Sequence, residues 1–309
     1  MRLMSTIGSV VLTLSACMGA DDSDLQQKLA SESRTNGLAL AAAIGDEILV
    51  IPFDGPERHF QAEHRFSILT IGKSGQMVSW WFRKQDFFTT DGEFVVNSVG
   101  GQAISRTISK IAGFRPIALS DSAERIAFWA GHDFATEARP LYWSSLDLSN
   151  PVLINNQTGE PDWSPDGSAL VYAREGKIYI FDIANRSSRY LADGHDPTWS
   201  PNGKWIGFVA PDGHASLVTT AGEPQTWSMS QHRPISPMRW SPSGDFVSFT
   251  EKLPTMYALL DAVAKLVVSR VSDGKALTIR TLGSESVTSR AFYWITGYRG
   301  FCSKCTKRD

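Results

Sequence analysis

Short runs of apolar or alternating residues, each preceded by a turn that contains Pro and Gly, dominate the second half of the chain. Three such runs are Ala169–Tyr172, Trp205–Phe208 and Phe246–Phe249. Runs of this length, with few long amphipathic segments among them, are typical of β-strands and not of a helical bundle. The pattern predicts an all-β fold made of many short strands.

The turn before each run is an internal repeat. The motif Trp-Ser-Pro-X-Gly occurs at 163–167, 199–203 and 240–244, at spacings of 36 and 41 residues. Pro favours the φ of the second turn position, Gly accepts the positive φ that closes a hairpin, and the Ser hydroxyl can bond to the turn amides. Each copy therefore predicts a strand that ends at Trp, a tight turn and a second strand.

The clearest copy shows how large one structural unit is. After its turn the chain continues through Lys177–Asp182 and Arg189–Leu191, which completes four strands in about 36 residues, the size of one β-propeller blade. Weaker copies at 71–75 and 119–123 extend the pattern. The expected blades cover residues 66–113, 114–157, 158–193, 194–234 and 235–285.

Two half-units remain at the ends of the chain. Residues 38–65 contain outer strands without an inner strand, and residues 286–309 contain an inner strand at Phe292–Trp294. Together they complete a sixth blade, in which N- and C-terminal strands pair and leave no open edge. We therefore predict an all-β fold, a six-bladed β-propeller of four-stranded antiparallel blades, over residues 38–309.

The repeats also resemble those of a known family. Residues 161–182, with their partner at 197–203, resemble the WD-like repeats of the TolB-type six-bladed propeller, and the resemblance covers roughly residues 38 to 300. The separate α/β domain that precedes the propeller in TolB has no room here. Binding activities that depend on that domain are therefore not expected of this chain.

The N-terminus has the pattern of an export signal. Arg2 precedes an apolar run of about eight residues, Ile7–Leu14, which is far shorter than the roughly 20 residues that span a bilayer. Ser15 and Ala16 before Cys17 resemble the bacterial lipobox, which implies cleavage after residue 16 and acylation of Cys17. A plain secretory signal with an incidental Cys17 is the alternative.

We expect three segments along the chain: a lipoprotein signal peptide at 1–16, a polar tether at 17–37 with a short helix at Asp24–Ser31, and the propeller. Met18 after the acylated Cys resembles an outer-membrane sorting pattern. The expected location is the periplasm-facing side of the bacterial envelope, anchored by lipid, with no transmembrane helix in the mature chain.

Composition and charge narrow the function classes. The chain has 309 residues, 42% of them hydrophobic, and 30 Lys and Arg against 32 Asp and Glu leave a net charge of −2. The broad basic field that drives nucleic-acid binding is absent, so no nucleic-acid partner is expected. Phosphate-binding loops, dinucleotide turns and hydrolase elbows are also absent, so no cofactor is expected.

The remaining cysteines form an isolated pair. Cys302 and Cys305 lie in a Cys-Ser-Lys-Cys sequence near the C-terminus. A structural zinc site needs four ligands, and no second Cys pair or nearby His supplies them, so no metal is expected. We interpret the pair as a small disulfide in an oxidising periplasm, with two free thiols as the alternative.

Propeller geometry places two sets of residues on one face. The entry to each inner strand and the loop between the second and third strands lie at the end that we call the upper face, and the Ser-Pro-X-Gly turns lie on the lower face. Four positions before each Trp equivalent, at the mouth of the central channel, the repeats place Ser67, Arg115, Gly159, His195, Ser236 and Arg290, and two acidic residues follow directly, Glu160 and Asp196.

Such a rim suits an anion or a metal, although inner strands that converge on a wet channel display polar groups without any function. If the protein is an enzyme, the rim predicts a hydrolase, lyase or cyclase. Its catalytic candidates are His195, Arg115, Glu160 and Arg290.

The upper face also carries the longest loops. Insertions are expected at 85–93, 131–140 and 254–264, with the apolar residues Phe87, Phe88, Phe134, Met256, Tyr257 and Leu260. Apolar insertions on one rim favour a docking surface; the alternative is that they fold down over the blades. The preferred function is a non-enzymatic binding module for an envelope protein or a cell-wall component.

Overall fold

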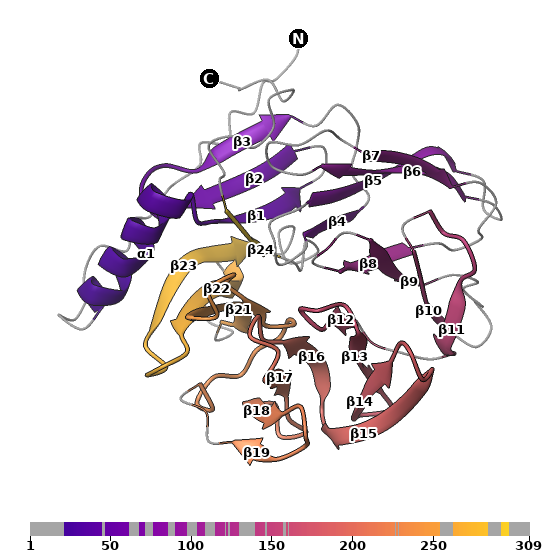
Figure 1. Ribbon diagram of the computed structural model, residues 1–309. Helices are drawn as coiled ribbons and strands as arrows, with labels where there is room; N and C mark the ends of the chain where they lie inside the picture. The colour runs from indigo at the N-terminus through magenta and orange to yellow at the C-terminus, as the bar shows by residue number, and fades with distance from the viewer. Residues whose placement is uncertain are drawn as a thin grey trace, which may run out of the picture.

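The computed structural model in Figure 1 is a ring of small sheets around a central axis, with one helix on the outside. It describes residues 22–44, 47–61, 68–71, 77–85, 90–97, 104–108, 115–120, 122, 124–129, 140–145, 147–156, 159, 161–225, 227, 229–253, 262–283 and 292–296. For strands β4–β7 it describes the backbone alone.

Strand pairing groups the strands into six four-stranded antiparallel sheets. Side chains are described in every sheet except the one made of β4–β7. The helix is α1 (Asp22–Asn36). In pairing order the strands are β24 (Tyr293–Ile295), β1 (Ala39–Ile44), β2 (Glu47–Pro52), β3 (Arg58–Gln61); β4 (Ile68–Ile71), β5 (Met77–Gln85), β6 (Thr90–Asn97), β7 (Ile104–Ile108); β8 (Arg115–Leu119), β9 (Arg125–Trp129), β10 (Leu141–Ser145), β11 (Val152–Asn155); β12 (Asp162–Trp163), β13 (Ala169–Arg174), β14 (Lys177–Asp182), β15 (Ser187–Asp193); β16 (His195–Trp199), β17 (Trp205–Val209), β18 (Ala215–Thr219), β19 (Pro224–Gln225); and β20 (Arg239–Trp240), β21 (Phe246–Lys252), β22 (Ala262–Arg270), β23 (Ala276–Gly283).

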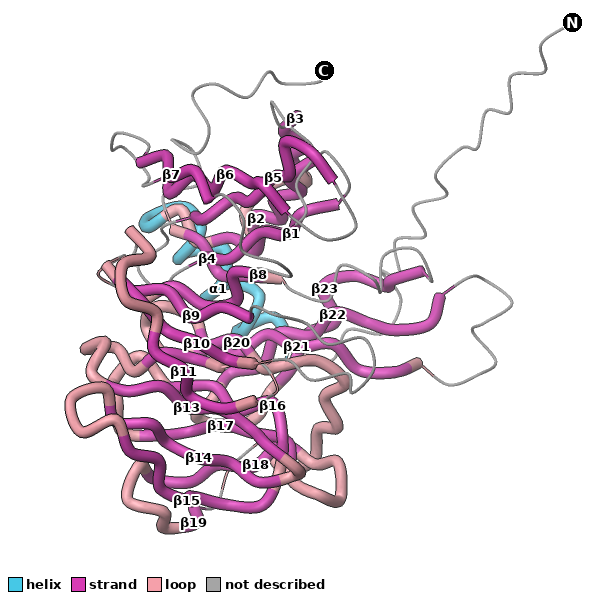
Figure 2. The backbone as a smooth tube through the Cα atoms, turned by 90° about the vertical axis from the view of Figure 1, so that its right-hand side faces the viewer, coloured by secondary structure: helices cyan, strands magenta, loops and turns pink. Residues whose placement is uncertain are grey.

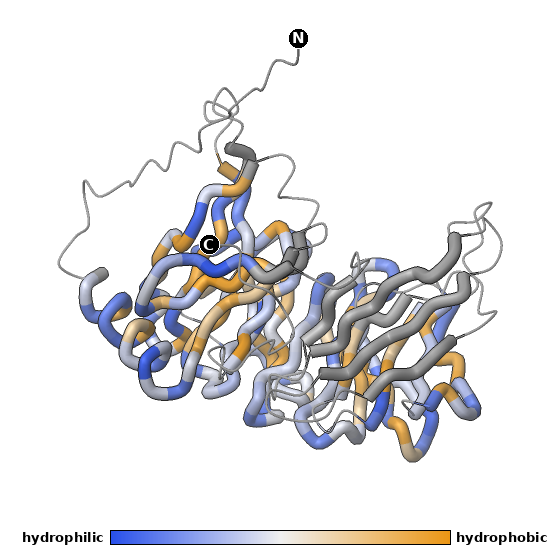
Figure 3. The backbone as a smooth tube through the Cα atoms, turned by 90° about the horizontal axis from the view of Figure 1, so that it is seen from above, coloured by the Kyte–Doolittle hydropathy of each residue, from blue (hydrophilic) through white to orange (hydrophobic). Residues whose placement is uncertain are grey.

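The fold is therefore an all-β propeller with four-stranded antiparallel blades, as predicted. Hydrophobic residues are concentrated in the strands, and the turns between them are mainly hydrophilic (Figure 3). This distribution follows from the packing of each sheet between two neighbours, which buries both of its faces.

The two ends of the chain meet in one sheet. β1 pairs on one side with β2 and on the other with β24, with Leu40 opposite Trp294. Figure 1 shows the indigo N-terminal strand beside the yellow C-terminal one. The predicted pairing of N- and C-terminal strands is confirmed, and β24 covers the edge of β1 that would otherwise be unpaired.

The repeated turns have the predicted geometry. Gly167, Gly203 and Gly244 have φ values of 69°, 74° and 77°, in the region that side chains other than Gly rarely adopt. In the first copy the Ser164 Oγ donates to the Asp166 carboxylate at 2.6 Å and accepts the Ala169 N–H at 2.9 Å. The turn polar groups are thus satisfied locally, which explains why the same residue types recur.

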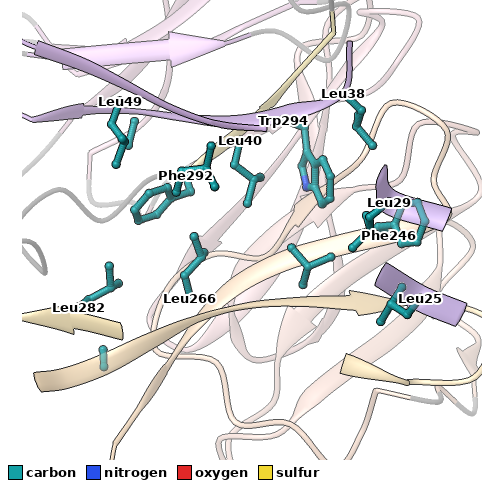
Figure 4. Close-up of a cluster of buried hydrophobic side chains, with 14 residues drawn as sticks. Leu25, Leu29, Leu38, Leu40, Leu49, Phe246, Leu266, Leu282, Phe292 and Trp294 are labelled. Atoms are coloured by element: carbon teal, nitrogen blue, oxygen red, sulfur yellow. The ribbon is translucent and has the colours of Figure 1, made fainter. Parts of the chain in front are cut away.

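The segment expected to be a polar tether contains the expected helix at Asp24–Ser31, but this helix is longer than predicted and packs against the propeller. Residues 22–36 form the 15-residue helix α1, of which Leu25 and Leu29 are buried at 0% and 1% exposure. They pack with Phe246 and neighbouring residues in one cluster (Figure 4). The physical reason is the four-residue spacing of the two Leu, which places both on one face of an otherwise polar helix.

Polar contacts also attach this helix to the last blade. Lys28 Nζ lies 3.2 Å from the Asp245 carboxylate, and Arg270 donates to the Asp24 carboxylate at 2.7 Å. Asp245 follows the Ser-Pro-Ser-Gly turn, and Arg270 ends β22 before its turn to β23, so both contacts lie at the lower face. The beginning of α1 is therefore at the lower side of the ring.

Two of the expected insertions are shorter than predicted, because the strands that flank them continue to pair. Gln85 pairs with Thr90, and pairing extends through residues 90–93. On the last blade Glu251 pairs with Lys265, and Ala264 with Lys252, so residues 262–264 belong to β22. Paired backbones satisfy their own N–H and C=O groups, and opposite charges across the ladder add to this. Figure 2 shows β22 and β23 projecting beyond the other strands.

Removing β24 should disrupt the ring. A chain that ends at Glu285 loses Trp294, whose Nε1–H donates to the Arg239 carbonyl at 2.8 Å, and exposes the edge of β1. We expect aggregation, or unfolding at much lower denaturant concentration than the full chain. Truncation after Phe301, which removes only the region from Cys302, is the control and should unfold nearly as the full chain does. Equal stability of both truncated chains would contradict closure through β24.

Candidate functional site

The described residues of the predicted channel rim lie where inner strands enter. Arg115 begins β8 and pairs with Trp129, and His195 begins β16 and pairs with Val209. In each case the partner is at the end of the second strand of the blade, so both residues lie on the upper face. Three further rim candidates are outside the described residues: Ser67, Glu160 and Arg290.

His195 and the following Asp196 form a local pair. The Nδ1 of His195 lies 3.1 Å from the Asp196 carboxylate, and the two side chains are 53% and 30% exposed. Asp196 has a φ of 51°, and the ladder with β17 shifts register between His195 and Thr198. The pair therefore lies on a kinked, solvated strand entry, where a surface ion pair contributes little to stability.

Two other rim positions have structural contacts. Ser236 is 4% exposed, and its Oγ accepts the Thr250 N–H at 3.0 Å. The Gly159 N–H donates to the Ala173 carbonyl at 2.8 Å. These contacts join the strand entry to the neighbouring strand of the same blade.

The predicted docking residues and cysteines cannot be placed. Phe87, Phe88, Phe134, Met256, Tyr257 and Leu260 lie outside the described residues, as do Cys17, Cys302 and Cys305. What the structure describes on the upper face is instead a group of polar residues on the segment between β19 and β20.

This segment carries Arg233, whose guanidinium is held at two points. One nitrogen donates to the Asp212 carbonyl at 3.0 Å, and the other lies 2.6 Å from Nε2 of His214. Since guanidinium only donates, Nε2 accepts, and Nδ1 carries the proton that bonds to the Ser230 carbonyl at 2.9 Å. His214 is thus a neutral acceptor here, and the guanidinium is oriented by uncharged groups.

Directly before Arg233, His232 belongs to a part-buried polar group. Its Nδ1 lies 3.0 Å from one oxygen of Glu251, which also accepts the Arg233 backbone N–H at 3.1 Å. The other oxygen of Glu251 lies 3.1 Å from Nζ of Lys265. His232 packs against Phe249, and its Nε2 is buried without a hydrogen-bond partner in the described part of the chain.

The protonation of Glu251 follows from these contacts. Burial disfavours its charged form, but hydrogen bonds from His232, Lys265 and the Arg233 N–H outweigh that effect and lower its pKa to about 2. Glu251 is therefore a fixed anion that holds the segment bearing Arg233 against β21.

The sequence analysis did not single out His214 or His232 and missed this cluster. The available signal was the length of the connection: residues 226–238 link β19 to β20, whereas a single residue, Gly194, links β15 to β16. A long connection at the upper face, with His232, Arg233 and the apolar Ile235, was a candidate for function.

Neither a metal-binding cluster nor a membrane-spanning helix is found in the described part of the chain. No group of three or more His, Cys, Asp or Glu side chains there is arranged to hold a metal ion. Among the same residues, no helix is both long and apolar enough to cross a membrane.

The Glu251 contacts predict a pH dependence of stability. A carboxylate whose pKa is lowered from 4.5 to about 2 stabilises the fold above pH 4.5, and this contribution is lost as the pH falls towards 2. We expect the difference in unfolding free energy between wild type and Glu251→Gln to shrink by about 2 kcal/mol between pH 6 and 3, measured by denaturant titration. Glu223→Gln, at an exposed turn position, is the control and should show no such change.

Comparisons with known proteins connect this architecture to solved structures. No protein-family model matches the chain, and no curated protein matches it by sequence. TolB from Acinetobacter baumannii is 16% identical with a TM-score of 0.56, over 83% of this chain and 66% of that one. A putative TolB from Agrobacterium tumefaciens is 17% identical with a TM-score of 0.53, over 84% and 98%.

A lower similarity, with 14% identity and a TM-score of 0.46 over 74% of each chain, is to an oligogalacturonate lyase in complex with manganese. The chain spans about two thirds of the length of the Acinetobacter TolB. At 16% and 17% identity the two TolB similarities establish the fold alone. The chain is thus a β-propeller with the fold of the TolB structures.

Proposed function

We propose that the chain is a lipid-anchored, six-bladed, TolB-like propeller of the bacterial envelope that binds a protein or a cell-wall component without catalysing a reaction. The observation that carries the proposal is the similarity of fold to two TolB structures over 83% and 84% of this chain. Location in the periplasm, attached to the outer membrane, is part of the same proposal.

The position of α1 supports an anchor at the lower face. Only residues 18–21 separate Cys17 from the beginning of the helix, and a stretch of this length spans at most about 20 Å. The first turn of α1 contacts Arg270 beside the β22–β23 turn. An acyl group on Cys17 would therefore hold the lower face near the membrane and leave the upper face free for a partner.

Catalysis at the channel mouth is the alternative that we test against binding. Of its four candidates, the structure describes the side chain of His195 alone, and the partner found for it is the adjacent, solvated Asp196. A general base is usually oriented by a more buried group. We therefore favour binding.

Replacing Cys17 tests the anchor. We expect Cys17→Ala to leave the detergent-soluble membrane fraction or to remain unprocessed, because several acyl chains are needed for stable attachment. The readout is the distribution of the protein between membrane and soluble fractions. Cys302→Ala is the matched control and should stay with the membrane. Equal retention of a Cys17 variant whose signal has been cleaved would rule out the lipid anchor.

A pair of variants separates docking from catalysis. If the upper loops bind a partner, Tyr257→Ala combined with Leu260→Ala should abolish partner capture with little change in the melting temperature, because exposed insertion residues add little to the core. Capture is measured by in-cell crosslinking from position 256. His195→Ala should capture normally. Loss of capture in a well-folded His195→Ala, with capture retained in the loop variant, would favour the channel mouth with Arg115, Glu160 and Arg290.

A further inference from the structure

On the basis of the proposed function, we infer that Arg233 and Ile235 form a recognition site for an acidic segment of a protein partner. The site lies on the upper face, on the connection between β19 and β20. It uses described residues that are separate from the predicted docking loops and from the predicted channel rim.

The charge of Arg233 is available to a ligand. The side chain is exposed, and both acceptors of its guanidinium, the Asp212 carbonyl and Nε2 of His214, are uncharged. Among the described residues no carboxylate forms an ion pair with this guanidinium. The nearby Asp212 carboxylate instead accepts the backbone N–H of His214 at 3.0 Å. Arg233 therefore keeps N–H donors and a positive charge for a carboxylate from outside.

The segment is fixed before any partner binds. The backbone N–H of Arg233 donates to Glu251, the Ala215 N–H donates to the His232 carbonyl at 2.9 Å, and the Ile235 N–H donates to the Thr250 carbonyl at 2.8 Å. Glu251 is itself held by His232 and Lys265. A guanidinium held in this way loses little conformational entropy on binding, which favours affinity.

An apolar contact lies two residues further along. Ile235 is 46% exposed, whereas Pro234 before it is buried. Of the three large hydrophobic side chains exposed in the described part of the chain, Leu153 and Tyr190 lie on the outer strands β11 and β15, and Ile235 lies on the upper face. An oriented Arg beside an exposed aliphatic residue matches the composition of interface centres.

These features define the chemistry of the partner segment. Lys252, exposed at the end of β21, adds a second cation, whereas the charge of Lys265 is used by Glu251. A matching segment would present an Asp or Glu side chain to Arg233 and an apolar side chain to Ile235. Charge pairing at an exposed site implies that binding weakens as salt increases.

Selection of peptides from a random heptapeptide display library on the purified full chain tests the inference. We expect the selected peptides to contain Asp or Glu with an apolar residue within two positions. Synthetic versions should bind Arg233→Gln at least tenfold more weakly than wild type. Arg186→Gln, which removes the same charge from an exposed turn on the lower face, is the matched control and should bind as wild type does.

Because Arg233→Gln also removes the contacts to Asp212 and His214, Ile235→Ser serves as a second variant that leaves those contacts intact. It should also weaken binding several-fold with an unchanged melting curve. Selection of no peptide, selection without acidic residues, or equal binding to both Arg variants would overturn the inference. If Arg233→Gln still captures a partner in cells, the inferred site is wrong and the proposed function stands. If the wild-type protein captures no partner, both the inferred site and the proposed function are wrong.

Discussion

The structure depends on the packing of each sheet against its neighbours around a closed ring. Buried tryptophan side chains make many of the contacts between neighbouring sheets. The indole N–H of Trp163 donates to the Ala118 carbonyl of the preceding sheet, that of Trp240 to the Thr198 hydroxyl, and that of Trp294 to the Arg239 carbonyl. Each of these three Trp side chains thus supplies apolar area and one directed hydrogen bond to the preceding sheet, whereas the indole N–H of Trp199 donates to the Gly203 carbonyl of its own turn. Without closure, the apolar sheet faces beside the gap would be exposed.

The same closure explains why α1 belongs to the propeller. Its Leu25 and Leu29 share a cluster with Leu40 of β1, Trp294 of β24 and Phe246 of β21 (Figure 4). The helix therefore covers the junction between the closing sheet and the last blade.

The rigid part of the upper face depends on the carboxylate of Glu251, which lies near the upper end of the last blade. Glu251, with its pKa lowered to about 2, binds donors from β22 and from the β19–β20 connection, and so holds the backbone of Arg233 in place. Among the described residues, the partner of His195 is the adjacent and solvated Asp196.

The sequence by itself determined the architecture, because each Trp-Ser-Pro-X-Gly copy specifies its strands and its turn through local contacts such as Ser164 with Asp166. It also identified the pairing of the terminal strands, since half-units at both ends have one way to complete a blade. The tertiary structure alone decided two features. Burial of Leu25 and Leu29 depends on a surface that β21, β23 and β24 create together, and the Arg233 cluster joins residues from four separate segments. Neither follows from local pattern, because the contacts join segments that only tertiary packing brings together.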